Sequence, residues 1–373
     1  LMYERIIPEV LREYDPDTFY WPASPSSGGS FDEPNDPNRG DVHYWEVWHG
    51  NKPFAEYRKY FFRYASEFGF QSFPSVKTLE TVTDDPRELN PFSYVMEKHQ
   101  RNYGGNGKIA KYMQAAYRYP ENFSDFVYAS QLLQADGIRY GVEHYRRNRG
   151  RCMGAIYWQL NDCWPVISWS SIDYYGRWKA LHYYAKRFFA PVMLSCEEQS
   201  WMTVEADMNR QHFEFEKSIR LNVTNETLSA RKVLVKFAVR DASAKILRQE
   251  ERWVEVPALS SVWMDKVELP GIDCFNEYVS YEAWENEKII SQGTVIFSYP
   301  KYFHYQDPKL SVRVEGDEII VSAEAYAKSV EIQNENDDLI LEDNYFDMNA
   351  GERRVKILDG KPENLKVRSV YDI

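Results

Sequence analysis

The stretch Ser66-Glu67-Phe68-Gly69-Phe70-Gln71-Ser72-Phe73-Pro74 sets one acidic residue in an apolar run that closes on a proline. We predict a strand over residues 64–70, with Glu67 toward its end. In barrels of alternating strands and helices, the carboxyl ends of the strands carry the catalytic side chains. A lone glutamate in such a place more often forms a salt bridge or a cap, so the surrounding sequence has to decide between these roles.

Helix-like and strand-like segments alternate on both sides of this stretch, up to about residue 190. The expected helices cover residues 2–14, 123–148 and 178–189, and the expected strands cover residues 19–23, 43–48, 64–70 and 152–160. Strands that alternate with helices favour a parallel sheet with helical crossovers. About four strand–helix units are present, roughly half of a (β/α)8 TIM barrel.

The pattern changes after residue 190 to an alternation of apolar and polar residues, which is typical of half-buried strands. Turn-forming residues recur between these strands, and a segment rich in proline and aromatic residues spans 299–308. We therefore predict a multidomain α/β plus all-β protein. Residues 1–192 are assigned to the C-terminal half of a barrel, and residues 193–300 and 301–373 to two immunoglobulin-like β-sandwiches.

Composition narrows the classes of partner. The net charge of -12 argues against a nucleic-acid partner, because phosphate binding needs clustered Lys and Arg. No stretch approaches the roughly 18 uninterrupted apolar residues of a membrane span, so no membrane partner is expected. The four cysteines form no CxxC pair and no zinc spacing with the histidines, so we expect no metal and no cofactor.

The scattered cysteines fit free thiols in a reducing compartment, which favours a cytoplasmic location. Residues 1–10 lack the pattern of a signal peptide and have the spacing of a helix interior. We therefore expect further residues upstream, where a targeting signal would also lie.

Aromatic residues are in excess, at 16% of the chain, and seven of the eleven tryptophans precede residue 190. A large core accounts for many of them. Sugar sites also use aromatic faces, because the C–H groups of a pyranose ring pack on a flat π-surface. The excess is therefore compatible with a carbohydrate site.

Two further motifs accompany the stretch at 66–74. They are His43-Tyr44-Trp45-Glu46-Val47-Trp48-His49-Gly50 and Met153-Gly154-Ala155-Ile156-Tyr157-Trp158-Gln159-Leu160-Asn161-Asp162-Cys163-Trp164-Pro165. Together with residues 20–25 and 343–347, these motifs resemble the β-mannosidase branch of glycoside hydrolase family 2, over essentially the whole chain. The family also holds β-galactosidases and β-glucuronidases.

The resemblance implies that the last four strands of a catalytic barrel are present, followed by the C-terminal sandwiches. Glu67 then matches the nucleophile at the end of the seventh strand, and Trp158 matches an aromatic residue that packs against the sugar. Trp45, Trp48 and His49 match a segment that lines the same pocket. His49 is expected to bond the substrate or to orient Glu67, with a purely structural role as the alternative.

The same resemblance assigns Asp162 and Asn161 to holding the loop after the eighth strand. The run that contains Gln71 favours mannose over galactose.

One part of the family pattern is missing. The family's acid/base is a glutamate preceded by asparagine at the end of the fourth strand, and the Asn-Glu pairs of this chain all follow residue 224. We regard Glu46, Asp173 and Glu143 as poor substitutes, because a proton donor must reach the leaving oxygen. A half barrel also leaves sheet edges unpaired. We expect these edges to be covered by the missing N-terminal part of the same protein or by a second copy in a homodimer.

The sequence therefore favours a retaining exo-β-mannosidase that removes terminal β-D-mannose from a β-mannoside oligosaccharide, present here without the acid/base half of its barrel. One alternative is a β-galactosidase or β-glucuronidase of the same family. The other is a non-catalytic fragment that binds a carbohydrate or a protein through its sandwiches.

Overall fold

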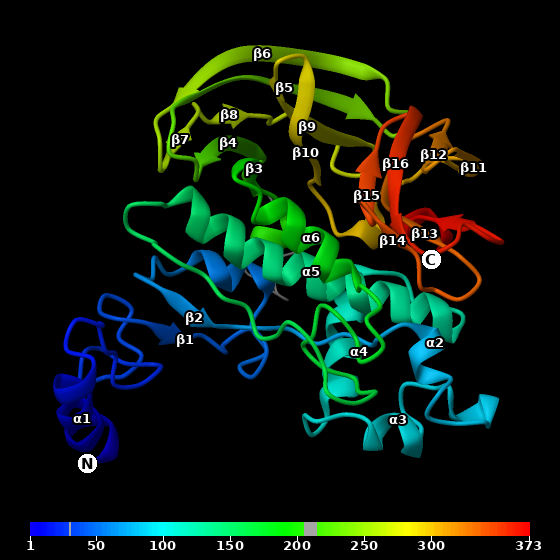
Figure 1. Ribbon diagram of the computed structural model, residues 1–373. Helices are drawn as coiled ribbons and strands as arrows, with labels where there is room; N and C mark the ends of the chain where they lie inside the picture. Colours follow the sequence, from blue (N-terminus) through cyan, green and yellow to red (C-terminus); the bar gives the residue numbers. More distant parts are fainter. Residues whose placement is uncertain (30, 205–214) are drawn as a thin grey trace.

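Two helices lie between a small parallel sheet and two antiparallel sandwiches in the computed structural model (Figure 1). The helices are α5 (Phe123–Arg147) and α6 (Ala180–Phe188), close to the expected ranges 123–148 and 178–189. The structure describes residues 1–29, 31–204 and 215–373. The part of the predicted alternation that falls on residues 205–214 lies outside these residues.

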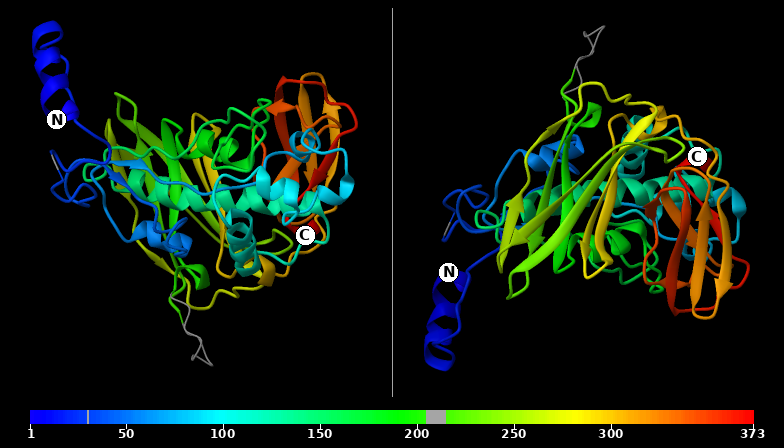
Figure 2. Two further views of the ribbon diagram at one scale, coloured as in Figure 1. Left: turned by 90° about the horizontal axis from the view of Figure 1, so that it is seen from below. Right: turned by 90° about the horizontal axis from the view of Figure 1, so that it is seen from above.

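Residues 2–14 form the expected helix, as a π-helical turn over Met2–Ile6 that continues into α1 (Ile7–Tyr14). Figure 2 shows α1 standing away from the rest of the molecule. The strand expected over residues 19–23 is wrong, because these residues belong to no strand and run as irregular chain. They are held by side chains instead, since the Trp21 indole donates to Asp41 at 2.9 Å.

The parallel sheet is shorter than its apolar sequence suggests. It consists of β1 (Val42–His43) and β2 (Ala65–Glu67), where strands were expected over residues 43–48 and 64–70. Residues 152–160 form no continuous strand, although the segment runs parallel to β2 through a bridge between Ala65 and Ala155. Residues 46–50 form a turn in place of the expected strand end. Burial of aromatic rings, not a long hydrogen-bonded ladder, accounts for the apolar runs.

Five short helices lie between β1 and α5 in the sequence. They are the 3-10 turns η2 (Phe54–Arg58) and η3 (Pro86–Glu88) and the α-helices α2 (Val76–Leu79), α3 (Tyr94–Lys98) and α4 (Gly105–Ala116). Helix α5 begins at Asn122, whose side chain accepts from the Asp125 amide at 3.0 Å, and ends in basic residues that complement its dipole. No helix among the described residues has the length and apolar character needed to cross a bilayer.

The first sandwich follows the period-two pattern of its sequence. One sheet has the order β3-β4-β7, with β8 also pairing with β4, and the other has the order β10-β9-β5-β6. Inward residues of both sheets form one apolar core, as expected for stacked antiparallel sheets. The strands are β3 (Val192–Gln199), β4 (Ser218–Asn225), β5 (Arg231–Asp241), β6 (Ile246–Val256), β7 (Ser260–Trp263), β8 (Val267–Glu268), β9 (Glu277–Glu285) and β10 (Lys288–Ile296).

The second sandwich packs directly on the helices. Its sheets have the orders β11-β12-β16-β14 and β15-β13-β17. Its apolar core is continuous with that of the helical region, and Tyr128 of α5 donates to the Ser329 carbonyl at 2.6 Å. Its strands are β11 (Ser311–Glu315), β12 (Glu318–Ala323), β13 (Ala327–Gln333), β14 (Ile340–Leu341), β15 (Phe346–Met348), β16 (Gly351–Asp359) and β17 (Lys366–Arg368). The architecture is therefore mostly β-structure with a helical part beside a short parallel sheet.

Candidate active site

Glu67 ends β2, and its carboxylate faces the histidine at the matching position of β1. The parallel register pairs His43 with Glu67, and His43 Nδ1 lies 3.1 Å from Glu67 Oε2. The two side chains are 23% and 22% exposed, so a ligand in solvent can reach the carboxylate. The backbone also ties the two strands here, because the Tyr44 amide donates to the Glu67 carbonyl at 2.7 Å.

A second carboxylate, Asp41, lies beneath this pair. It accepts from Ser24 Oγ at 2.6 Å, from Ser66 Oγ at 2.5 Å and from the Ser26 amide at 3.0 Å, in addition to the Trp21 indole. Burial works to raise the pKa of Asp41, but these hydrogen bonds outweigh it and leave the pKa below its usual value. Asp41 is therefore an ionised group inside a nearly closed set of donors.

Three tryptophans surround the backbone just beyond Glu67. A Cβ atom placed on Gly69 would lie 2.4 Å from the Trp158 carbonyl oxygen, 3.0 Å from the Trp45 ring and 3.1 Å from the Trp169 ring. Only glycine fits between these groups. The Trp158 side chain is 45% exposed, so the structure brings Trp45 and Trp158 beside the Glu67 strand while a face of Trp158 stays open to solvent.

Trp48 does not line the site as expected. It is fully buried, and its ring packs edge-on against Phe70 at 5.0 Å and Trp169 at 6.1 Å. The reason is local: residues 46–50 turn instead of continuing as a strand, so the period-two assignment of faces fails after Trp45.

The structure places His49 away from Glu67. His49 is exposed in the turn and packs on the Trp45 ring at 5.1 Å, with its pKa lowered by partial burial and by Lys108. The histidine that contacts Glu67 is His43. The motif at residues 43–50 contains His43, but nothing in its local pattern predicts the contact with Glu67, which depends on the register between β1 and β2.

The loop after the third parallel segment is fixed by Asp162, as expected. Ser168 Oγ and Ser170 Oγ donate to the two oxygens of this carboxylate at 2.7 and 2.5 Å. Asn161 is exposed in the same loop. Gln71 is fully buried, and its amide has no hydrogen-bond partner among the described residues.

Two of the three carboxylates considered as substitute acids are committed elsewhere. Glu143 is buried on α5 and pairs with Arg147 at 3.4 Å. Asp173 is buried and accepts from the amides of Tyr175 and Arg177, each at 3.0 Å. Glu46 is exposed in the turn that follows β1. The described residues contain no group of three or more His, Cys, Asp or Glu side chains arranged to hold a metal ion.

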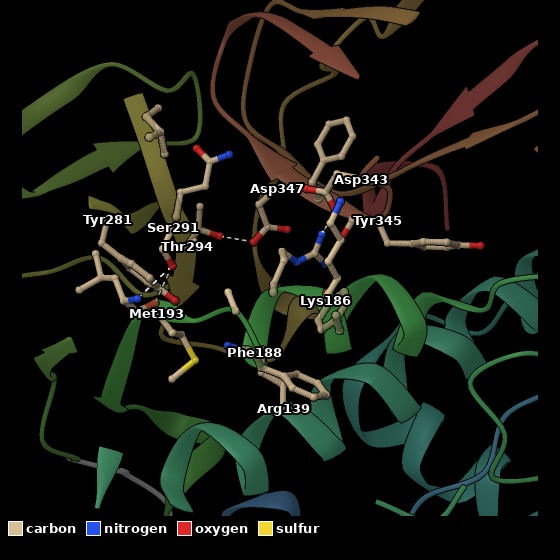
Figure 3. Close-up of a pocket in the computed structure, with 18 of the residues that line it drawn as sticks. Arg139, Lys186, Phe188, Met193, Tyr281, Ser291, Thr294, Asp343, Tyr345 and Asp347 are labelled. Atoms are coloured by element: carbon tan, nitrogen blue, oxygen red, sulfur yellow. Dashed lines mark hydrogen bonds and ion pairs between the residues drawn. The ribbon is translucent and has the colours of Figure 1, made fainter. Parts of the chain in front are cut away.

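A cavity of about 420 Å³ lies far along the chain from Glu67, where α6, β10 and the second sandwich meet (Figure 3). Its charged lining is largely paired: Arg187 and Arg353 bind the two oxygens of Asp343 at 2.5 and 2.6 Å, and Lys328 contacts Asp347 at 3.3 Å. We regard it as the junction between domains. The partly exposed Glu67 carboxylate beside His43 is the better candidate for chemistry.

Comparison with known proteins gives two family matches. Residues 217–302 match the Mannosidase Ig/CBM-like domain, and residues 305–373 match an Ig-fold domain. Curated relatives include Beta-mannosidase B of Thermothelomyces thermophilus, 30% identical over 99% of this chain and 46% of that protein. Beta-mannosidase B of Aspergillus terreus is 29% identical over 96% of this chain and 44% of that protein. The chain thus spans less than half the length of these relatives.

Solved structures agree. The β-D-mannosidase from Dictyoglomus thermophilum superimposes with a TM-score of 0.85 at 28% identity, over 99% of this chain and 44% of that chain. The exo-chitosanase CsxA of Amycolatopsis orientalis, in complex with PNP-beta-D-glucosamine, gives a TM-score of 0.61 at 16% identity, over 85% of this chain and 45% of that chain. At that identity the second likeness concerns the fold alone.

Proposed function

The chain belongs to the β-mannosidase branch of glycoside hydrolase family 2, as the C-terminal portion of such a protein, and from this we propose that the whole protein is a retaining exo-β-mannosidase. The observation that carries the proposal is the Glu67 carboxylate at the carboxyl end of a parallel strand, held by His43 and open to solvent. We further propose that residues 1–192 are the second half of a (β/α)8 barrel. The three parallel segments and the crossover helix α5 support this.

In the proposed reaction, Glu67 attacks the anomeric carbon of a terminal β-linked mannose as the bond to the leaving oxygen breaks. A carboxylic acid gives its proton to that oxygen, and water later cleaves the glycosyl ester with net retention of configuration. His43 keeps the carboxylate aimed, and Trp158 offers an aromatic face to the sugar ring.

The proton donor is proposed to come from the remainder of the protein. All Asn-Glu pairs of the chain lie in the two sandwiches; Glu226, for example, pairs with Arg149 at 3.2 Å. Glu143 and Asp173 are engaged in buried contacts of their own. A second carboxyl group contributed by another part of the barrel satisfies the need for two carboxyl groups on either side of the scissile bond.

Support for mannose as the sugar comes from the names of two relatives that match nearly the whole chain, each of which is called Beta-mannosidase B. An assay of the full-length protein with aryl β-mannoside, β-galactoside and β-glucuronide in parallel tests this choice. We expect the mannoside to have a kcat/KM at least about 100-fold above the others, because hydrogen bonds to ring hydroxyls discriminate strongly. Faster hydrolysis of the galactoside or the glucuronide would instead assign the protein to the corresponding alternative.

We propose that the sandwiches serve mainly as packing for the barrel. The apolar core runs from the helices into the second sandwich. Arg58, ahead of β2, binds Glu198 of β3 at 2.7 Å, and Tyr140 of α5 donates to the same carboxylate at 2.5 Å. The alternative is that the sandwiches bind glycans, and a glycan array probed with the Glu67→Gln protein tests it. The active site of this protein is first blocked with an inhibitor. A glycan that still binds would then indicate a binding module in the sandwiches.

A further inference from the structure

The His43 ring lies between two carboxylates, and its hydrogen bonds fix where its protons are. Nδ1 is 3.1 Å from Oε2 of Glu67, and Nε2 is 3.0 Å from Oγ of Ser24. The Ser24 hydroxyl lies 2.6 Å from Oδ2 of Asp41. A continuous chain of contacts thus joins Asp41, through Ser24 and His43, to the candidate nucleophile.

The contacts of Asp41 and Ser24 determine whether Nε2 of His43 carries a hydrogen. Asp41 is ionised, because the hydrogen bonds from its hydroxyl, indole and amide donors outweigh burial and keep its pKa low. An ionised carboxylate only accepts hydrogen bonds, so the single hydroxyl proton of Ser24 goes to Asp41. Ser24 then presents lone pairs to the ring, and Nε2 has to carry a hydrogen.

The contact with Glu67 determines whether Nδ1 of His43 carries a hydrogen. A nucleophilic carboxylate also only accepts, so Nδ1 has to donate to it. Both ring nitrogens therefore carry hydrogen when Glu67 is ready to attack. A neutral ring with hydrogen on Nε2 alone would turn the Nδ1 lone pair toward the carboxylate and repel it.

We propose that His43 is a positioning residue for Glu67, kept doubly protonated by Asp41 acting through Ser24. This rests on the proposed role of Glu67 as nucleophile. During attack, the new bond forms between a Glu67 oxygen and the anomeric carbon, and the bond to the leaving oxygen breaks. The leaving oxygen takes its proton from the separate acid. His43 keeps both of its protons and passes none on, and its Nδ1–H stays bonded to the ester that forms.

The surroundings of His43 provide a matched control. Among the described residues, the charged groups that face the ring are Glu67 of β2, in direct contact, and Asp41, which acts through Ser24; the backbone amide of His43 donates to Asn35 Oδ1 at 2.9 Å. Ser66 Oγ donates to the same Asp41 oxygen as Ser24, at 2.5 Å, but its contacts are with Asp41, Val42 and Ser24 and not with the ring. Ser24→Ala and Ser66→Ala therefore both remove a hydroxyl from Asp41, and only Ser24→Ala breaks the link to His43.

The test is the pH profile of kcat/KM for the complete protein with an aryl β-mannoside that has a good leaving group. Such a substrate needs little help from the acid, so an alkaline limb reports loss of the proton that His43 holds. Ser24→Ala is expected to move this limb to lower pH, because the Asp41 charge no longer reaches the ring. Ser66→Ala is expected to leave the limb where it is. Equal shifts in both variants, or no shift in Ser24→Ala, would overturn the proposal.

Substitution of the ring itself gives a second, independent readout. His43→Gln keeps an N–H donor for Glu67 without a titrating group, so the alkaline limb should disappear while activity remains measurable. His43→Phe removes the donor, and we expect kcat/KM to fall about 100-fold through misplacement of the carboxylate. A limb that persists unchanged in His43→Gln would overturn the positioning role.

Active-site titration with an activated 2-fluoro-mannoside counts the competent sites in each preparation and so corrects for misfolded protein. It also separates the two proposals. If the wild-type protein is labelled at Glu67 but substitution of His43 or Ser24 leaves the pH profile unchanged, only the positioning role is lost. If Glu67 is not labelled in the wild type, the nucleophile assignment fails and the positioning role fails with it.

Discussion

The region before residue 190 and the region after it differ in how regular their backbone is. In the first, the parallel strands β1 and β2 have two and three residues, and the rest is turns, helices and stacked aromatic rings. In the second, strands reach eleven residues in regular antiparallel ladders. The irregular region holds the partly exposed Glu67 carboxylate, and the strands of the regular region pack face to face around apolar residues. Chemistry in this protein is therefore expected to depend on the first region and stability on the second.

The largest effect that this division predicts is loss of activity in Glu67→Gln. The substitution keeps the shape of the side chain and removes the nucleophile, so kcat/KM should fall by about four orders of magnitude, or ~5.5 kcal/mol of transition-state stabilisation. Steady-state kinetics on the complete protein measures it. Glu46→Gln, in the exposed turn after β1, is the control; wild-type activity in Glu67→Gln together with a large loss in Glu46→Gln would place the essential carboxylate on Glu46 instead.

A core substitution in the first sandwich should show the opposite behaviour. Leu221→Ala on β4 removes a side chain that is 3% exposed, and we expect the free energy of unfolding to fall by about 2–5 kcal/mol. The kcat/KM per folded molecule should stay unchanged. Denaturant unfolding and kinetics on the same samples provide the comparison, with Leu228→Ala, 87% exposed in a loop, as the control. A lowered kcat/KM in folded Leu221→Ala protein would contradict the expectation that activity depends on the first region alone.

Gly69→Ala probes the close approach of the tryptophans in the first region. The added methyl group would meet the Trp158 carbonyl oxygen at 2.4 Å, so the segment that carries Trp158 has to move away from β2. A shift of this size should lower kcat/KM about 100-fold. Gly107→Ala in α4, whose added methyl meets no atom within 4 Å, should leave the kinetics as they are and strengthen the helix by up to ~1 kcal/mol. Wild-type kinetics in Gly69→Ala would show that Trp158 is not held against β2.

The smallest expected effect lies at a contact between the two regions. The Ser75 hydroxyl donates to Asp337, and burial together with nearby Glu331 raises the pKa of Asp337 from 3.8 to about 6. The native state therefore binds the proton more tightly than the unfolded chain, and stability falls as the pH rises from about 4 to about 6. Above pH 6 the full cost is present.

Asp337→Asn should remove that cost. Because the side chain is partly exposed, we expect a gain of only about 1–2 kcal/mol at pH 7, and almost none at pH 3.5. Unfolding curves at the two pH values measure the difference. Asp338→Asn, at the exposed neighbouring position, is the matched control. A loss of stability at pH 7 in Asp337→Asn would mean that its charge stabilises the junction.

How far the sequence predicts the structure also differs between the two regions. Alternation found the sandwich strands because each sheet there has one apolar face, as in Val233, Val235 and Phe237 of β5. The parallel segments have no such contrast, since buried rings lie on both sides, and the strands expected over 43–48 and 64–70 shrank to two and three residues. Helix α5 was predicted almost to the residue because its helical periodicity is long.

The candidate site shows the same limit. The roles of Glu67, Trp45 and Trp158 were predicted from the resemblance and stay predictions, although the structure does place Trp45 and Trp158 beside the strand that carries Glu67. Trp48 was misplaced because a turn replaced the strand after Trp45. The contact from Ser24 to His43 was not predictable, because it depends on the path of the long loop that separates them and on the register between β1 and β2.

The most direct test of the account is peptide mapping of the complete protein after reaction with an activated 2-fluoro-β-mannoside. This reagent brings its own leaving group, and the fluorine slows hydrolysis of the covalent adduct. The account predicts a mannosyl-sized mass gain on the peptide that contains Glu67, and no such gain in Glu67→Gln. Labelling of a different residue, or no labelling of a protein that hydrolyses β-mannosides, would contradict it.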